Sequence, residues 1–172
     1  MNILAARPYI STRTRALTPD EQETRRLAYA IKDTAATMTD FNTAAQDMAR
    51  LIDGPCWLIP IPDRNGNLDA NTRLAAMIAR HIGPGAQVVR AIRRTAPVES
   101  QCDRHKQKRG PSPISDHNFV RTPRWLTARP TYFVDNVTTS GHTFQAAHLA
   151  MGFGTGLAFA DANCRQNHTP TF

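Results

Sequence analysis

The sequence is poor in cysteine and has no long hydrophobic run, and both absences narrow the class of protein. Its 172 residues include three cysteines, Cys56, Cys102 and Cys164, which lie far apart and form no Cys-x-x-Cys pair. We therefore expect free thiols and neither a structural zinc site nor a disulfide scaffold. No apolar run approaches the roughly 20 residues of a membrane helix. Residues 1–7 are too weakly apolar for a signal peptide, so we expect a cytoplasmic protein with no membrane partner.

Acidic residues are scarce relative to basic ones. Asp and Glu number 14 against 21 Lys and Arg, which gives a formal net charge of +7 and a pI near 10.0. Such a surplus favours nucleic acid, nucleotides or polyphosphates as partners, or serves solubility alone. With 41% hydrophobic residues, the chain is too apolar for a disordered protein and long enough for one globular domain.

Helix and strand patterns alternate along the chain. Thr18 and Glu21 form a capping-box pattern, Asp40 is a candidate cap for a second helix, and residues 1–17 suit an arm or an edge strand. The alternation favours a mostly parallel sheet of the five-strand class with helices on both faces, which binds ligands at the carboxyl ends of its strands. The periodicities predict helices over residues 19–36, 41–52, 74–82 and 144–151, and strands over residues 56–59, 87–92, 131–134 and 157–160.

A long polar stretch, residues 93–129, interrupts this alternation. A connection of this length in a compact chain is functional or disordered. We expect a single domain over residues 1–172, in which the helical residues 1–54 pack on the core and residues 162–172 form a tail. The sequence has no internal repeat and no low-complexity segment.

The segment after the strand over residues 131–134 carries the most chemistry. Asp135 and Asn136 follow the strand, where they suit hydrogen bonds from sugar hydroxyls, and a turn rich in hydroxyls then opens a helix. The backbone N–H groups and the helix N-terminus of such a turn suit a phosphate, and Gly141 permits close approach. The same residues also fit a plain strand, turn and helix in which Thr or Ser is the cap.

This segment resembles the phosphoribosyl diphosphate (PRPP) binding motif of type I phosphoribosyltransferases, in which an acidic pair precedes Thr-Thr-Gly-x-Thr. Asn136 stands in place of the second acid. Thr139 occupies the position of an Asp base in purine-salvage relatives, which argues against 6-oxopurine salvage. The resemblance implies that Asp135 is catalytic and meets the metal indirectly, through PRPP. It implies a PRPP site composed of Asp135, Asn136, Thr138, Thr139, Ser140, Gly141, His142 and Thr143.

Segments upstream are similar, in order along the chain, to the ComF-type competence phosphoribosyltransferases. The resemblance implies a phosphoribosyltransferase-like α/β sheet with a pyrophosphate loop at Asp63 and Arg64. It also implies that residues 93–129 are a flexible hood loop whose Lys106, Lys108 or Arg109 neutralises the leaving group. The similar segments are residues 27–32, Ile59 to Pro62, Asn71 with Leu74 and Ala75, residues 93–97, and Arg109 with Phe119.

The resemblance implies a Mg²⁺-dependent phosphoribosyltransferase that transfers a phosphoribosyl group from PRPP to an unidentified nitrogen acceptor of small size. Homodimers are common among similar proteins. Two other hypotheses stay open on the same fold. One is a regulatory protein that binds PRPP or nucleotides without turnover, which Asn136 favours, and the other is a basic protein that handles DNA. No Ser/His/Asp or Cys/His set stands out in the sequence.

Overall fold

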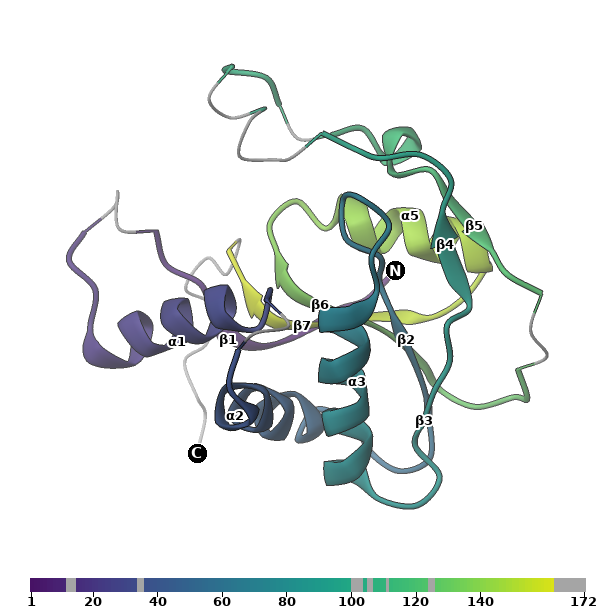
Figure 1. Ribbon diagram of the computed structural model, residues 1–172, viewed down its shortest axis with the longest axis horizontal. Coiled ribbons are helices and arrows are strands. Elements are labelled where there is room, and N and C mark those ends of the chain that lie inside the picture. Colours follow the sequence, from purple (N-terminus) through teal and green to yellow (C-terminus); the bar gives the residue numbers. More distant parts are fainter. Residues whose placement is uncertain are drawn as a thin grey trace.

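A five-stranded sheet runs through the centre of the computed structural model (Figure 1). Its strands lie in the order β1-β7-β6-β2-β3, and each neighbouring pair is parallel, as expected. The structure describes residues 1–11, 15–33, 36–99, 104, 107–110, 112–123 and 126–162. The strands of the sheet are β1 (Ile3–Pro8), β2 (Trp57–Pro60), β3 (Gln87–Val88), β6 (Thr131–Thr138) and β7 (Thr155–Asp161).

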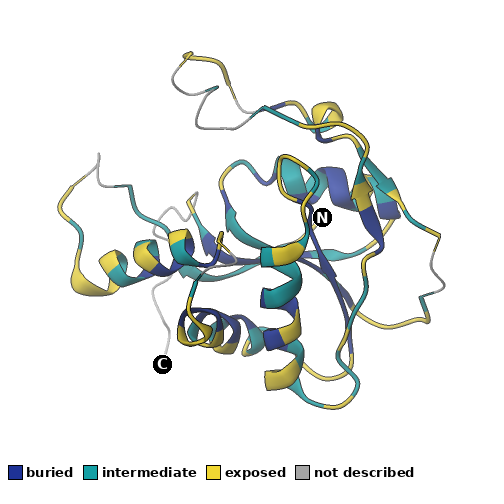
Figure 2. Ribbon diagram, in the orientation of Figure 1, coloured by how far each residue is buried: buried dark blue, intermediate teal, exposed yellow. Residues whose placement is uncertain are grey.

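Helices cover both faces of the sheet. On one face lie α1 (Pro19–Ala30), α2 (Met38–Ala49) and α3 (Asp69–Ile82), and on the other lies α5 (His142–Met151). In Figure 2 the buried residues follow the sheet and the sides of the helices that face it. Within the described ranges, no helix is both long and apolar enough to cross a membrane.

The central strands are apolar on both sides because both faces of the sheet are covered. Val134 and Leu157 are paired in register and join the core beneath α2 and α3. Phe133 and Ala158 join the core beneath α5. Leu27 of α1 belongs to the same core cluster as the residues of α2 and α3.

The helix starts confirm one predicted cap and correct another. Thr18 Oγ1 accepts from the Glu21 N–H at 3.3 Å, and Glu21 Oε2 accepts from the Thr18 N–H at 2.9 Å, which completes the capping box. The prediction of Asp40 as a cap was wrong, because Thr37 caps α2 and its Oγ1 accepts from the Asp40 N–H at 3.2 Å. Asp40 lies in the first turn instead, where its charge suits the helix dipole.

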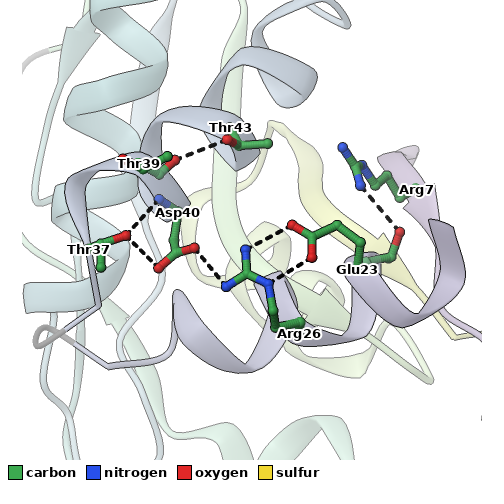
Figure 3. A network of polar contacts seen from close by, with 8 residues as sticks. Arg7, Glu23, Arg26, Thr37, Thr39, Asp40 and Thr43 are labelled. Atoms are coloured by element: carbon green, nitrogen blue, oxygen red, sulfur yellow. Dashed lines mark hydrogen bonds and ion pairs between the residues drawn. The ribbon is translucent and has the colours of Figure 1, made fainter. Parts of the chain in front are cut away.

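A network of polar contacts joins β1, α1 and α2 (Figure 3). Arg26 Nη1 lies 2.8 Å from Asp40 Oδ1, and Arg26 Nε donates to Glu23 at 2.7 Å. Nearby, Arg7 Nε of β1 donates to Asp47 of α2 at 2.7 Å. The Thr37 hydroxyl and then Arg26 hold the pKa of Asp40 below its usual range. Because Arg26 is exposed, these contacts orient α1 more than they stabilise it.

The predicted strand over residues 87–92 divides into two elements. β3 ends at Val88, and Ala91 N–H then donates to the Val89 carbonyl at 3.0 Å in a tight turn. The chain leaves the main sheet there, and β4 (Ile92–Arg94) pairs antiparallel with β5 (Phe119–Arg121). The hood loop therefore contains a two-stranded sheet and a 3₁₀ turn, η1 (Ile114–His117), packed over α5 (Figure 1).

Two of the three cysteines, Cys102 and Cys164, lie outside the described residues, as do residues 163–172 of the tail. Cys56 is buried with a free thiol, as expected, and burial raises the pKa of that thiol.

The glycines that follow α5 provide a test of the packing. Gly154 has φ +111°, and a Cβ there would lie 2.6 Å from the Phe133 ring, whereas Gly152 has φ +81° and open space around it. Gly152→Ala carries only backbone strain and should cost about 1 kcal/mol. Gly154→Ala adds overpacking and should cost about 2–4 kcal/mol. Urea unfolding of both variants measures the difference, and equal losses would contradict the packing of Gly154 against Phe133.

Candidate functional site

The candidate site lies where the strand order reverses. The chain runs from β2 through α3 to β3 in one direction across the sheet, and from β6 through α5 to β7 in the other. β2 and β6 are neighbours, so the segments that follow them diverge and leave a crevice at their carboxyl ends. A cavity of about 830 Å³ lies there, within the size range of small-molecule sites. It is lined by residues from both segments, from α3 and from the hood loop.

The early end of β2 opens this cavity. Pro60 pairs with Val134, and Ile61 N–H still donates to the Val134 carbonyl at 3.0 Å. Pro62 has no N–H with which to continue the ladder. β6 runs on to Thr138, paired only with β7 over its last residues. Asp135 and Asn136 therefore belong to the strand itself, where they line the cavity, and do not follow its end as expected.

Asp135 is a partly buried acceptor in the wall of the cavity. Its Oδ1 accepts from Asn71 Nδ2 at 3.1 Å and from the Asn136 N–H at 2.8 Å. Asn71 also donates to the Ile61 carbonyl at 2.8 Å, which ties α3 to the end of β2. Burial raises the pKa of Asp135, while the Asn136 N–H, Asn71, Lys32 and Arg94 oppose that rise. A carboxylate in this setting gains from any further donor or cation that a ligand brings.

Arg94 of β4 connects three walls of the cavity. Its Nε donates to the Asp63 carbonyl at 2.8 Å, its Nη2 donates to the Pro62 carbonyl at 3.4 Å, and its Nη1 donates to the His117 carbonyl. The guanidinium also lies over the Phe119 ring, 4.3 Å from the centroid. Burial lowers the pKa of Arg94, and the charges of Asp135 and Asp63 act in the opposite sense. The result is a fixed positive charge beside Asp135.

The loop after β2 brings Asp63 and Arg64 to the cavity, as the pyrophosphate-loop hypothesis requires. Asp63 Oδ1 accepts from the N–H groups of Asn65 and Asn67, each at 2.8 Å, so this carboxylate shapes its own turn. The backbone of Arg64 is fixed because its carbonyl accepts from the Val98 N–H at 2.9 Å. The Arg64 side chain is exposed and lines the cavity, so its positive charge lies at this wall.

The turn after β6 does not line the cavity, although residues on both sides of it do. Of the predicted PRPP-binding residues, Asp135 and Asn136 of β6 and Thr143 of α5 line the cavity. The remaining five are not part of its lining, and the hood loop contacts one of them, because His142 Nδ1 lies 2.8 Å from the Ser112 carbonyl. A carbonyl only accepts, so Nδ1 carries the proton of this bond. The five are Thr138, Thr139, Ser140, Gly141 and His142.

The predicted hood cations are not brought to Asp135. Lys108 and Arg109 are exposed and do not line the cavity. Arg109 forms an ion pair with Glu99, and Arg104 lies 3.4 Å from the same carboxylate. Lys106 lies outside the described residues. Glu99 itself lines the cavity. Its carboxylate therefore holds Arg104 and Arg109 at the edge of the cavity.

Several polar residues of the cavity wall were not predicted as site residues, and among them are Lys32, Asn71, Arg94 and His117. The first three fall in segments that resemble ComF-type proteins, so the resemblance marked them without assigning them a role. His117 has no such signal, because a single histidine in a polar stretch is most often a surface residue.

The cavity suits Mg²⁺ that is bound mainly through substrate oxygens. Among the described residues, no three His, Cys, Asp or Glu side chains lie close enough to share a metal ion. Mg²⁺ bound by one carboxylate and substrate phosphates needs no such cluster. Asp135 lines the cavity and would meet such an ion through PRPP, whereas Asp63 is engaged by its own turn.

Protein-family models and curated proteins were both compared with this chain. No family model matches it, and no curated protein matches it significantly. The geometry of the cavity and the resemblance of its motif are therefore the basis of the functional proposal.

Replacing Asp135 should stabilise the free protein. Asp135→Asn removes a charge that its partly buried surroundings disfavour and keeps an oxygen that can accept from Asn71 and the Asn136 N–H, so we expect a gain of about 1 kcal/mol, or a few degrees in Tm. Thermal unfolding followed by circular dichroism measures it. Asp53→Asn, at an exposed site, is the control and should change nothing. A Tm below that of the wild type for Asp135→Asn would contradict the burial of this charge.

The stability of the protein should fall in mild acid through His117. Burial, followed by the charges of Arg94 and His142, lowers the pKa of His117 from 6.5 to about 4, and Asp116 acts in the opposite sense. Because the unfolded chain binds this proton more tightly, the contribution is complete above pH 6.5 and is lost as pH falls towards 4. It amounts to about 3 kcal/mol at most. Urea unfolding between pH 4 and 7 should show a flatter pH profile for His117→Phe, and an unchanged profile would contradict the assignment.

Proposed function

We propose that this protein is a phosphoribosyltransferase that binds PRPP with Mg²⁺ in the cavity between β2 and β6. One observation carries the proposal: Asp135 is a partly buried carboxylate that lines the cavity at the reversal of strand order, followed by a hydroxyl-rich turn and the N-terminus of α5. That arrangement suits a ligand with sugar hydroxyls and phosphates. The five-stranded parallel sheet is compatible with a type I phosphoribosyltransferase fold.

The chain's own residues would act mainly by position and charge. Asp135 accepts from the ribose hydroxyls, and Thr143, in the first turn of α5, holds the sugar phosphate. Arg64 meets the diphosphate, while the fixed charge of Arg94 favours anions in the same space. Mg²⁺, when bound with PRPP, offsets the charge of the departing diphosphate. In the transfer, the bond between C1′ and the diphosphate oxygen breaks, a bond from C1′ to the acceptor nitrogen forms, and the proton on that nitrogen is released.

A second candidate is a protein that binds PRPP without turning it over. Asn136 brings no charge to the site where the motif has a second acid, so a positively charged transition state at C1′ would be stabilised less. The ion pairs of Arg104 and Arg109 with Glu99 also keep these hood cations away from Asp135. Release of diphosphate in the presence of an acceptor separates this candidate from the enzyme.

Titration calorimetry with PRPP, with and without Mg²⁺, tests the binding site that both candidates share. We expect Mg²⁺-dependent binding to the wild type and at least tenfold weaker binding to Asp135→Ala, because the carboxylate acceptor for the ribose hydroxyls is lost. Asp53→Ala is the matched control and should bind as the wild type does. If the folded wild type does not bind PRPP, the proposal is wrong.

The positive charge of Arg64 should be needed for the diphosphate in particular. Arg64→Ala should weaken PRPP binding by roughly tenfold and ribose 5-phosphate binding by less than twofold, because only PRPP carries the diphosphate. Arg50→Ala, at an exposed position of the α2 C-cap, is the control for the loss of one positive charge. Equal losses for the two ligands would place Arg64 away from the diphosphate.

A further inference from the structure

A second cavity lies between the N-terminal segment and α1. Its volume is about 610 Å³, within the size range of small-molecule sites. One wall is the segment from Arg15 to Leu17, which we call the arm. The other wall is one face of α1, formed by side chains three or four residues apart: Gln22, Arg25, Arg26 and Tyr29. Among the described residues, this arm groove shares no lining residue with the main cavity beside Asp135, so the two are separate.

Contacts from the first turns of α1 hold the arm in place. Gln22 Nε2 donates to the Leu17 carbonyl at 3.1 Å. Arg15 Nη1 donates to Glu21 Oε2 at 2.8 Å, and the capping box fixes Thr18 beside them. The walls of the arm groove are therefore already formed, which lowers the entropy cost of ordering them when a ligand binds.

Arg25 is the one guanidinium of the arm groove that forms no ion pair among the described residues. The other two, those of Arg15 and Arg26, are paired with acids of α1 and α2. Arg25 is half-buried and lies over two aromatic rings, 5.5 Å from the Tyr29 centroid and 5.8 Å from the Tyr9 centroid. These cation–π contacts orient the guanidinium. A half-buried positive charge without a carboxylate partner gains from an anion that a ligand brings.

The two tyrosines leave that positive charge in place and add an aromatic wall. Burial, followed by a hydrogen bond with Tyr29, raises the pKa of Tyr9 to about 12, although the charge of Arg25 acts in the opposite sense. Tyr9 is therefore a neutral phenol and supplies no anion. Tyr29 is 54% exposed and lines the groove together with the apolar Leu17. Lys32 Nζ lies 5.4 Å from the centroid of the Tyr29 ring and adds a second positive charge nearby.

We propose that the arm groove is a second ligand site, which binds a small aromatic oxyanion. The anionic group pairs with Arg25, and the aromatic ring packs against Tyr29 and Leu17. Phosphate esters and carboxylates share the necessary chemistry, because either matches the two parallel N–H donors of a guanidinium. The inference does not depend on the proposed function, because the two cavities are lined by different residues.

The test is an NMR titration of the ¹⁵N-labelled full chain, followed through its backbone amides. The probes are phenyl phosphate and benzoate, and inorganic phosphate and benzyl alcohol represent the two halves of such a ligand. We expect at least one probe to shift the amides of Leu17, Arg25 and Tyr29. That probe should bind at least tenfold more tightly than either half, because each half keeps only one of the two contacts. The tighter probe identifies the oxyanion as a phosphate ester or a carboxylate.

Variants of the two proposed contacts locate the probe. Arg25→Gln should weaken its binding at least tenfold, and Arg25→Lys should weaken it less, because the charge remains while the two parallel donors are lost. Tyr29→Ala should weaken probe binding at least threefold and affect inorganic phosphate less. Arg50→Gln, at the exposed C-cap of α2, is the matched control for the loss of one positive charge. Arg64→Gln, in the main cavity, should also leave the affinity for the probe unchanged.

The outcomes separate this inference from the proposed function. The inference is wrong if neither probe shifts the groove amides at millimolar concentration, or if the shifts are confined to residues 61–71 and 135–145 of the main cavity. Undiminished binding to Arg25→Gln would overturn it as well, and if that variant does not fold, undiminished binding to Tyr29→Ala would do so. Probe binding at the arm groove of a protein that does not bind PRPP would confirm the second site and contradict the proposed function.

Discussion

The site depends on one constraint, the early end of β2 beside a longer β6. Pro60, Ile61 and Pro62 end the ladder because a second proline removes the next donor. β6 continues past this point, so its residues Asp135 and Asn136 lie in a strand with a partner on one side only. Two neighbouring elements bond to the groups at this mismatch: Asn71 of α3 donates to the Ile61 carbonyl and to Asp135, and Arg94 of β4 donates to the Asp63 carbonyl.

Arg94 links the segment that follows β2 to the hood loop. One guanidinium donates to carbonyls of the loop after β2 and to the carbonyl of His117 in η1. The position of His117 in the cavity is therefore coupled to the position of Asp63 and Pro62. A ligand held by the loop after β2 would find the wall formed by the hood loop already placed, which lowers the entropy cost of ordering that wall on binding.

Local patterns predicted the sheet and its helices because each depends on residues close together in sequence. The apolar runs that end at Ile59 and Val134 indicate strands buried on both faces, and the structure confirms strands there. The prediction that Asp40 caps α2 was wrong because Thr37, three residues earlier, occupies the cap position. The site was predictable only in part. Asp135 stands in a recognisable motif, whereas the contact that Asn71 makes with it spans 64 residues, and no local pattern specifies such a pair.

The hood loop was the least predictable part because the antiparallel pairing of β4 with β5 joins two segments of three residues each, too short for a periodic signal. His117 lies between them, and its burial results from the packing of this ribbon over α5. Its orphaned nitrogens follow from tertiary structure alone. A polar residue in a polar stretch gives no sequence signal that it will be enclosed.

The central claim is that the crevice between β2 and β6 is the ligand site, and hydrogen–deuterium exchange with and without PRPP and Mg²⁺ tests it most directly. Amides in three segments should exchange more slowly with ligand: residues 61–71 after β2, residues 135–145 around the end of β6, and residues 92–99 beneath the hood loop. The outer residues of α1 and α2 should be unaffected. Protection confined to α1 and α2, or no protection anywhere while the protein remains folded, would contradict the account.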